Sequence, residues 1–380
     1  MSRCPSPSRA TVDLSAIVAN LALVRQRAGD RNVLFAVKAD AYGHGAVAVA
    51  REVEATGAAD WLAVATVAEG QELVEAGIGL PILKLSPADP WDLDAAVRAG
   101  LRLTVLDAET VGQVEEASAR CGLHTRVHIG VDSGMGRIGL PPERLGEVVA
   151  AVDHSAHLDL EGVFTHLPIS DVPTGRAFTI VQIGRFLGAV ETVQKDRGPI
   201  PQVHMANSGA ILGHDLTGTT MVRAGIVGYG YDPDPGGPNS QGIGLRPALS
   251  WTSHIFFLKT VEAGTTIGYG RTWTAPSRTV IATVPVGYAD GYPRLLSSRG
   301  PVLIGGRRHL VAGRVCMDQI MVDLGPDADA AIGDEVVMIG SQGDAVVTAD
   351  ELAGLTGTIS YEITCDISKR VDRVWVGGTA

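Results

Sequence analysis

The chain has 380 residues, and its 31 basic and 42 acidic side chains give a formal net charge of −11. It contains no cluster of Lys and Arg interleaved with aromatic residues, and no apolar run of the roughly 18 residues that a membrane helix needs, so we expect neither a nucleic-acid partner nor a membrane span. The segment MSRCPSPSRA lacks the apolar stretch of a secretory signal, and the four cysteines show no paired spacing, so we expect a cytoplasmic protein that acts on a small molecule.

Eight short β-rich runs alternate with longer amphipathic stretches in the first part of the chain. The runs are LFAVK (34–38), WLAVA (61–65), PILKL (81–85), LRLTV (101–105), RVHIGV (126–131), EGVFTH (161–166), QVHMA (202–206) and MVRAG (221–225). Eight β–α units in succession predict a (β/α)8 barrel of the TIM type, and an open doubly wound sheet is the alternative that this pattern leaves open.

The rhythm changes beyond residue 240, where β-rich runs follow one another with Gly and Pro between them. The predicted strands are LSWTSHIFFLKTV (249–261), TVIATVPVGYA (279–289), PVLIGGRRHLVAG (301–313), QIMVDL (319–324) and DEVVMIG (334–340). We therefore expect a barrel domain over 1–240 and a mainly-β domain over 241–380, joined through YDPDPGGPNSQG (231–242).

Polar side chains stand at the ends of most barrel runs, which is where a β/α barrel places its active site. They are Lys38, Asp132, Arg137, His166, Asn207, Ser208 and Arg223. Taken singly, each has an ordinary explanation as a solvated strand end or part of a salt bridge. A ring of Lys, Arg, His and Ser at one mouth is costly unless an anion lies among them, so their convergence predicts a site for an anionic ligand.

Lys38 has an ability that the other strand-end residues lack. A lysine amine can form an imine with an aldehyde, and burial with nearby cations keeps such an amine unprotonated. Pyridoxal phosphate is the aldehyde cofactor that this chemistry suggests. Its phosphate needs a cradle, which the backbone amides of Gly225 and Ile226 and the hydroxyl of Ser208 can provide.

Nine motifs, in the same order along both predicted domains, resemble those of the fold-type III, pyridoxal-phosphate-dependent alanine racemases. They are VKADAYGHG (37–45), DSGMGRIG (132–139), EGVFTH (161–166), ANSGA (206–210), VRAGI (222–226), GYGRTW (268–273), VGYADGYPR (286–294), VCMDQ (315–319) and SYEITC (360–365). The resemblance implies a homodimer in which the β domain of one subunit completes the barrel site of the other.

The resemblance also implies the roles of individual residues. Lys38 holds the cofactor and acts as the base on one face of the substrate Cα, and Tyr269 of the partner subunit acts on the other face. Arg223 donates to the pyridine nitrogen and, with His166, assists the tyrosine. The phosphate contacts are Tyr42, Ser208, Gly225, Ile226 and Tyr361. The groups near the substrate carboxylate and the cofactor's phenolic oxygen are Arg137, Tyr288 and Met317, with Asp318 at the entrance.

One position departs from the family pattern. Most members have a lysine two residues before the Asp of DSGMGR, often carbamylated and oriented toward the arginine, whereas this chain has Gly130. We expect Arg137 to be held instead by an anion such as chloride, or by water. We also expect extra room near the cofactor, which makes serine or a broader range of amino acids an alternative to alanine.

Other functions have weaker support in the sequence. GMGRIG (134–139) formally matches a dinucleotide-binding motif, but two prolines follow it and no acid clearly ends a second strand. Pyridoxal-phosphate decarboxylases of the same architecture usually place a carboxylate on the pyridine nitrogen, where this chain has Arg223. A cofactor-binding protein without turnover would lack the second domain, and no His or Cys spacing is typical of zinc. We therefore predict a racemase of L- and D-alanine that supplies D-alanine for peptidoglycan.

Overall fold

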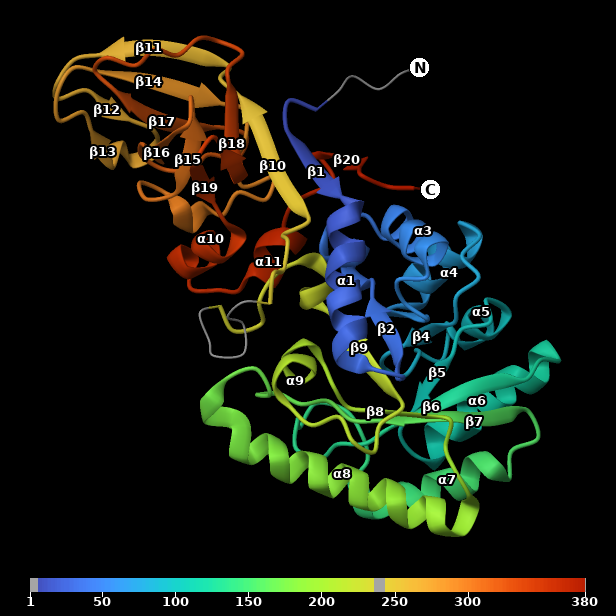
Figure 1. Ribbon diagram of the computed structural model, residues 1–380. Helices are drawn as coiled ribbons and strands as arrows, with labels where there is room; N and C mark the ends of the chain where they lie inside the picture. The colour runs from blue at the N-terminus through green and yellow to red at the C-terminus, as the bar shows by residue number, and fades with distance from the viewer. Residues whose placement is uncertain (1–5, 236–242, 380) are drawn as a thin grey trace. The chain divides into compact units, whose positions relative to one another are not determined.

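The computed structural model describes residues 6–235 and 243–379, which form two compact units (Figure 1). Residues 16–41, 46–235, 243–246 and 379 form the barrel unit, and residues 6–15, 42–45 and 247–378 form the β unit. No helix in the described ranges is long and apolar enough to cross a membrane, and these ranges hold no cluster of His, Cys, Asp or Glu suited to a metal ion.

The barrel unit is built on eight parallel strands. They are β2 (Asn32–Ala36), β3 (Trp61–Val64), β4 (Ile82–Lys84), β5 (Leu103–Val105), β6 (Thr125–Gly130), β7 (Leu158–Phe164), β8 (Gln202–His204) and β9 (Met221–Ala224). Their order is β4-β3-β2-β9-β8-β7-β6-β5. Arg102 closes the ring between β4 and β5, because its N–H donates to Ile82 O at 2.9 Å and its carbonyl accepts from Lys84 N at 3.0 Å. The predicted (β/α)8 barrel is confirmed, and the alternative prediction of an open doubly wound sheet is wrong.

Helices alternate with these strands along the chain. They are α1 (Leu14–Ala28), α2 (Lys38–Tyr42), α3 (Ala46–Thr56), α4 (Val67–Glu75), α5 (Leu93–Arg98), α6 (Ala108–Cys121), α7 (Leu145–Asp153), α8 (Arg176–Arg197) and α9 (Ser208–Gly213), with short 3₁₀ turns at η1 (Pro142–Arg144), η2 (Pro173–Gly175) and η3 (Ile226–Tyr229). Thr66 starts α4 by accepting a hydrogen bond from Glu69 N, while Glu69 accepts in return from Thr66 N.

The β unit contains one large sheet. Its strands are β1 (Arg9–Asp13), β10 (Leu249–His254), β11 (Phe257–Val261), β14 (Thr279–Val284), β15 (Pro301–Ile304), β16 (Arg307–Val311), β17 (Ile320–Gly325), β18 (Glu335–Gln342), β19 (Ala345–Val347) and β20 (Asp372–Val376). A separate pair comprises β12 (Thr266–Ile267) and β13 (Trp273–Thr274). The unit also has α10 (Ala349–Thr356), α11 (Ser360–Cys365) and the turns η4 (Tyr269–Arg271) and η5 (Arg294–Leu296).

The N-terminal segment corrects the predicted domain limits. The prediction assigned all of 1–240 to the barrel, but β1 pairs with β10 and β20 and so belongs to the β unit. Its alternating burial lets it fill a place inside that sheet. The predicted boundary between residues 240 and 241 lies outside the described residues.

Candidate functional site

Lys38 lies two residues after the end of β2, at the start of a left-handed turn. The four residues after it have φ between 51 and 54°, a conformation that costs non-glycine residues roughly 1–2 kcal/mol each. Side chains nearby hold this turn: Ala39 N donates to Glu69 Oε1, and Ala46 N donates to Asp40 Oδ1, both at 2.8 Å. The turn therefore fixes the direction in which the chain leaves Lys38.

Arg223 on β9 is buried and its guanidinium is held on several sides. Its Nη2 donates to Thr165 O at 2.8 Å and to Met205 O at 3.1 Å, and it lies 3.2 Å from His166 Nδ1. Its Nη1 lies 3.1 Å from His204 Nδ1. The structure thus brings together the predicted pair of Arg223 and His166, and adds His204 as a third partner.

His166 is surrounded by positive charge. Burial, followed by the charges of Arg223, Arg137 and Lys38, lowers the pKa of His166 to about 3, so this imidazole is neutral at physiological pH. In the described ranges, Arg137 has no hydrogen bond or ion pair within contact distance. Three predicted site residues therefore gather around a neutral histidine, and the positive charge that they bring together suits an anionic ligand.

The predicted phosphate cradle also assembles. Ser208 begins α9, and its Oγ accepts from Gly225 N at 3.2 Å and from Val227 N at 3.4 Å. Ile226 lies between these two amides at the start of η3. Asn207 caps α9 by accepting from Ala210 N at 3.1 Å. Ser208, Gly225 and Ile226 are thus side by side at the ends of β8 and β9.

The loop that carries Arg137 folds around one carboxylate. Asp132 Oδ1 accepts from Gly134 N at 2.9 Å and from Gly136 N at 3.1 Å. The GMGRIG segment is part of this loop and leads to the 3₁₀ turn η1, whereas dinucleotide binding needs a strand that turns directly into a helix. This geometry gives the motif a loop-forming role.

The space beside Gly130 is occupied. A Cβ on this residue would lie 2.8 Å from Leu106 Cδ2 and 3.3 Å from Phe164 Cζ. Hydrocarbon side chains therefore fill the space next to the Gly130 backbone, and the expected room near the cofactor stays a prediction. Losing a lysine side chain does not leave a hole when neighbours of the right size fill it.

We expect Gly130→Ala to lower the free energy of unfolding by about 1 kcal/mol, since the added methyl group must push Leu106 aside. Urea denaturation measures the change. Gly112→Ala in α6 is the matched control, because its Cβ would meet nothing within 4 Å, and it should be neutral or slightly stabilising. A Gly130→Ala protein as stable as the parent would show that the space is open after all.

The β unit brings the end of the Lys38 motif to α11. The rings of Tyr42 and Tyr361 lie 5.9 Å apart, and burial raises the pKa of the Tyr42 hydroxyl. Gly43 has φ 82°, and a Cβ there would lie 2.1 Å from Thr364 O. Two predicted phosphate contacts, far apart in sequence, are thus neighbours, and only glycine permits the close approach beside them.

Two further predicted motifs are joined by backbone hydrogen bonds. Tyr288 N donates to Cys316 O at 3.0 Å, which sets the Tyr288 loop against the loop of Met317. Asp318 forms an ion pair with Arg370, whose Nη1 lies 2.8 Å from Asp318 Oδ1. Tyr288, Met317 and Asp318 therefore form one cluster, as a shared substrate-binding role requires.

Tyr269 is highly exposed in the single chain. It opens η4 between Gly268 and Gly270, whose φ values are 74° and 71°. The residue is 72% exposed, and Met317 and Tyr288 are 52% and 42% exposed. An exposed tyrosine on a glycine-flanked turn is suited to contact another molecule.

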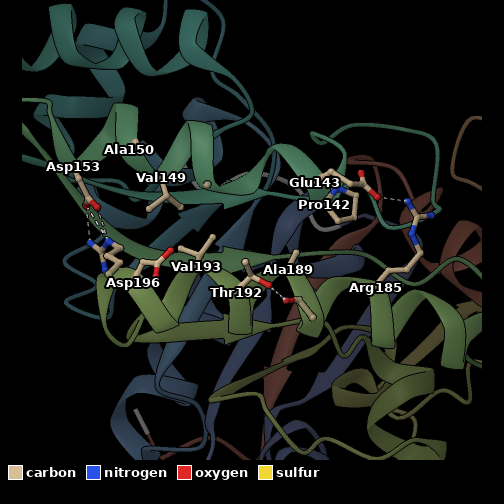
Figure 2. Close-up of a pocket in the computed structure, with 13 residues that line it drawn as sticks. Pro142, Glu143, Val149, Ala150, Asp153, Arg185, Ala189, Thr192, Val193 and Asp196 are labelled. Atoms are coloured by element: carbon tan, nitrogen blue, oxygen red, sulfur yellow. Dashed lines mark hydrogen bonds and ion pairs between the residues drawn. The ribbon is translucent and has the colours of Figure 1, made fainter.

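A groove between α7 and α8 is a separate feature (Figure 2). It has a volume of about 650 Å³, and ion pairs join Glu143 to Arg185 and Asp153 to Arg197 at its walls. The residues that line it include none of the predicted site residues, and the helices that form it lie on the outside of the strands. Its position does not match the strand ends at which a barrel carries its chemistry.

Sequence reasoning missed His204, His128 and Glu161. Neither histidine is among the predicted site residues, yet His204 contacts Arg223 directly. A signal was present, because His128, His204 and Arg223 each stand within a predicted barrel strand at a position with polar character among apolar neighbours.

Comparison with known proteins gives the family. The family described as "Alanine racemase, N-terminal domain" matches residues 12–233, and "Alanine racemase, C-terminal domain" matches residues 248–375. The chain is 67% identical over 377 residues to the alanine racemase of Cutibacterium acnes, covering 99% of this chain and 100% of the relative. It is 44% identical to that of Symbiobacterium thermophilum, with 98% of each chain covered.

Solved structures agree over nearly the whole chain. The alanine racemase of Clostridium difficile 630 has a TM-score of 0.91 at 38% identity, covering 98% of this chain and 97% of that one. The enzyme from the D-cycloserine producer Streptomyces lavendulae has a TM-score of 0.91 at 36% identity, covering 99% and 98%. With both domains matched in order and the motif residues assembled at the strand ends, this chain belongs to the alanine racemase family.

Proposed function

We propose that this member of the alanine racemase family interconverts L- and D-alanine with two bases, Lys38 on one face of the Cα and Tyr269 of a second copy on the other. Each base removes the proton of one enantiomer and returns a proton to form the other. The observation that carries the proposal is the gathering of Lys38, Arg137 and Arg223 around a neutral His166. Such a cluster suits an anionic cofactor and an amino-acid carboxylate.

The cofactor that fits is pyridoxal phosphate. When bound, it supplies the electron sink that makes the Cα proton removable. Lys38 offers the amine that would hold its aldehyde, and the hydroxyl and backbone donors already gathered would hold its phosphate. Those proposed phosphate contacts are Tyr42, Ser208, Gly225, Ile226 and Tyr361.

Arg223 would donate to the pyridine nitrogen. Burial, followed by the charge of Arg137, lowers the pKa of Arg223 to about 10, so the guanidinium remains charged at physiological pH. An arginine keeps its proton, so the ring nitrogen would stay unprotonated and the electron sink would be moderate. This favours simple proton transfer over decarboxylation, which is better served by a carboxylate at that position.

His166 would link Arg223 to Tyr269 through hydrogen bonds. Since a guanidinium only donates, the Nδ1 atom that faces Arg223 Nη2 accepts, and the ring proton is on Nε2. That N–H is the donor that His166 can offer to a phenolate. A neutral donor of this kind stabilises the charged form of Tyr269 without giving up its own proton.

The substrate carboxylate would be bound by Arg137, with Tyr288, Met317 and Asp318 completing the site from the β unit of the second copy. The exposure of Tyr269, Met317 and Tyr288 supports a homodimer with shared sites. Chloride or water beside Arg137 would take the place of the carbamylated lysine. We also propose that the enzyme acts in the cytoplasm and supplies D-alanine for peptidoglycan.

Incubation in D2O with pyridoxal phosphate tests the substrate. We expect Cα deuteration and inversion of L-alanine, and much slower inversion of L-serine, because the relatives that match both domains are alanine racemases. Nuclear magnetic resonance follows the deuteration, and chiral chromatography follows the enantiomer ratio. Faster inversion of serine would make serine the substrate, and no exchange with either amino acid would contradict the racemase.

A further inference from the structure

A chain of polar side chains runs through the interior of the barrel unit, away from Arg223. His204 Nδ1 lies 3.1 Å from Arg223 Nη1, and His204 Nε2 lies 2.9 Å from His128 Nδ1. His128 Nε2 in turn lies 3.5 Å from Glu161 Oε2. Both imidazoles are fully buried, and the ring of His128 also contacts Trp61 on β3, a strand that does not neighbour β6, so the chain lies inside the barrel.

Arg223 fixes the position of the ring proton on each of the two histidines. Arg223 can only donate, so His204 Nδ1 accepts and the proton of this neutral ring is on Nε2. That N–H donates to His128 Nδ1, so the proton of His128 is also on Nε2 and faces Glu161. Burial lowers the pKa of both imidazoles, which keeps both rings neutral.

Glu161 is the acceptor at the far end. Its Oε2 lies 3.4 Å from Arg102 Nε as well as 3.5 Å from His128 Nε2. None of these three buried atoms has a hydrogen-bond partner in the described part of the chain, so no second acceptor competes with Glu161 for His128 Nε2. Arg126 Nη1 lies 3.7 Å from the other carboxylate oxygen. The carboxylate of Glu161 thus lies close to one histidine and two arginines.

Gly162, the residue after Glu161, makes room for this arrangement. A Cβ on Gly162 would lie 2.4 Å from His128 Nδ1, the atom that accepts from His204. Its φ is not in the left-handed region, so the requirement for glycine here is the close approach of the imidazole. The EG pair of EGVFTH therefore provides both the acceptor and the space for the ring.

We propose that Glu161 is a positioning residue for Arg223, acting through His128 and His204. Its carboxylate accepts the last proton of the chain and polarises both imidazoles so that His204 presents a lone pair to the guanidinium. If the ring protons of His204 and His128 were on Nδ1, the N–H of His204 would face the Arg223 guanidinium. If they stayed on Nε2 without Glu161, the buried N–H of His128 would have no acceptor. The catalytic part of this inference rests on the proposed role of Arg223 in the racemase.

Nitrogen-15 magnetic resonance of the histidine rings provides the test. In the parent protein we expect His204 and His128 to be neutral with the proton on Nε2, and either ring with its proton on Nδ1 would overturn the proposal without any variant. In Glu161→Gln, which keeps an acceptor but removes its charge, we expect the N–H signals of both rings and the guanidinium signal of Arg223 to move, with the shift decreasing along the chain.

Turnover and a matched control complete the experiment. We expect Glu161→Gln to lower kcat about tenfold with KM little changed, because no substrate contact is lost. Glu115→Gln is the control, since Glu115 pairs with His157 at 2.7 Å and is not part of the series of side chains from Arg223 to Glu161. In this control only the His157 signal should move. A Glu161→Gln protein that changes only in stability, with unmoved His204 and Arg223 signals, would make Glu161 merely structural. Moved signals without any racemase activity in the parent would overturn the proposed function and leave the hydrogen-bond chain intact.

Discussion

Lys38→Ala is expected to reduce racemisation of alanine in both directions by about 10⁴-fold or more, because the substitution removes a catalytic base and the amine that would hold the cofactor. Lys38 is the only lysine in the left-handed turn Lys38–Tyr42, so no other residue of that turn can supply an amine. Rates with each enantiomer and the visible absorbance of the protein with pyridoxal phosphate measure the two losses.

Lys84→Gln is the matched control for this variant. Lys84 is another lysine at the end of a barrel strand, and it is buried; its Nζ donates to Ser86 O at 2.9 Å, Ser86 Oγ at 3.2 Å and Pro87 O at 2.7 Å. An amine occupied by three acceptors has a structural role, so the variant should keep its absorbance and turnover. If Lys38→Ala retained the absorbance of a covalently held cofactor, the assignment of Lys38 would be wrong.

Most of the barrel could be predicted from sequence because each strand is marked locally. Runs such as EGVFTH are short and bounded by helical patterns, and the observed strand β7 overlaps that run at 161–164. The place of β1 could not be predicted in this way, since its partners β10 and β20 are far along the chain. Local periodicity carries no information about such long-range pairing.

The predicted site has the same limits. Lys38 and Arg223 could be predicted from their positions at strand ends, because the active site of a β/α barrel lies where the strands end. It did not find Glu161 and His128, which lie deeper in the barrel and act on Arg223 through other side chains. The neighbours of Gly130 could not be predicted for a related reason, because Leu106 and Phe164, which lie next to its backbone, belong to other barrel segments.

Tyr269→Phe is expected to slow exchange of the Cα hydrogen of L-alanine by about 10²–10⁴-fold, the usual contribution of a general base. Exchange of the Cα hydrogen of D-alanine should change little, because Lys38 removes that proton and returns one to the same face. Cofactor absorbance should be unaffected, since the phenol does not hold the cofactor. Deuterium incorporation in D2O, measured separately for each enantiomer, gives the two rates.

The use of exchange rather than turnover follows from symmetry. The two enantiomers of alanine have equal free energy, so kcat/KM must fall by the same factor in both directions and cannot tell one base from the other. Tyr292→Phe serves as the control, because it removes a hydroxyl that is fully buried in the β unit, 3.5 Å from Pro301 O, and should leave both exchange rates intact. Equal losses of exchange for L- and D-alanine in Tyr269→Phe would contradict the assignment of opposite faces to the two bases. If Tyr269 acts on one face only, its loss leaves Lys38 able to exchange the hydrogen on the other face.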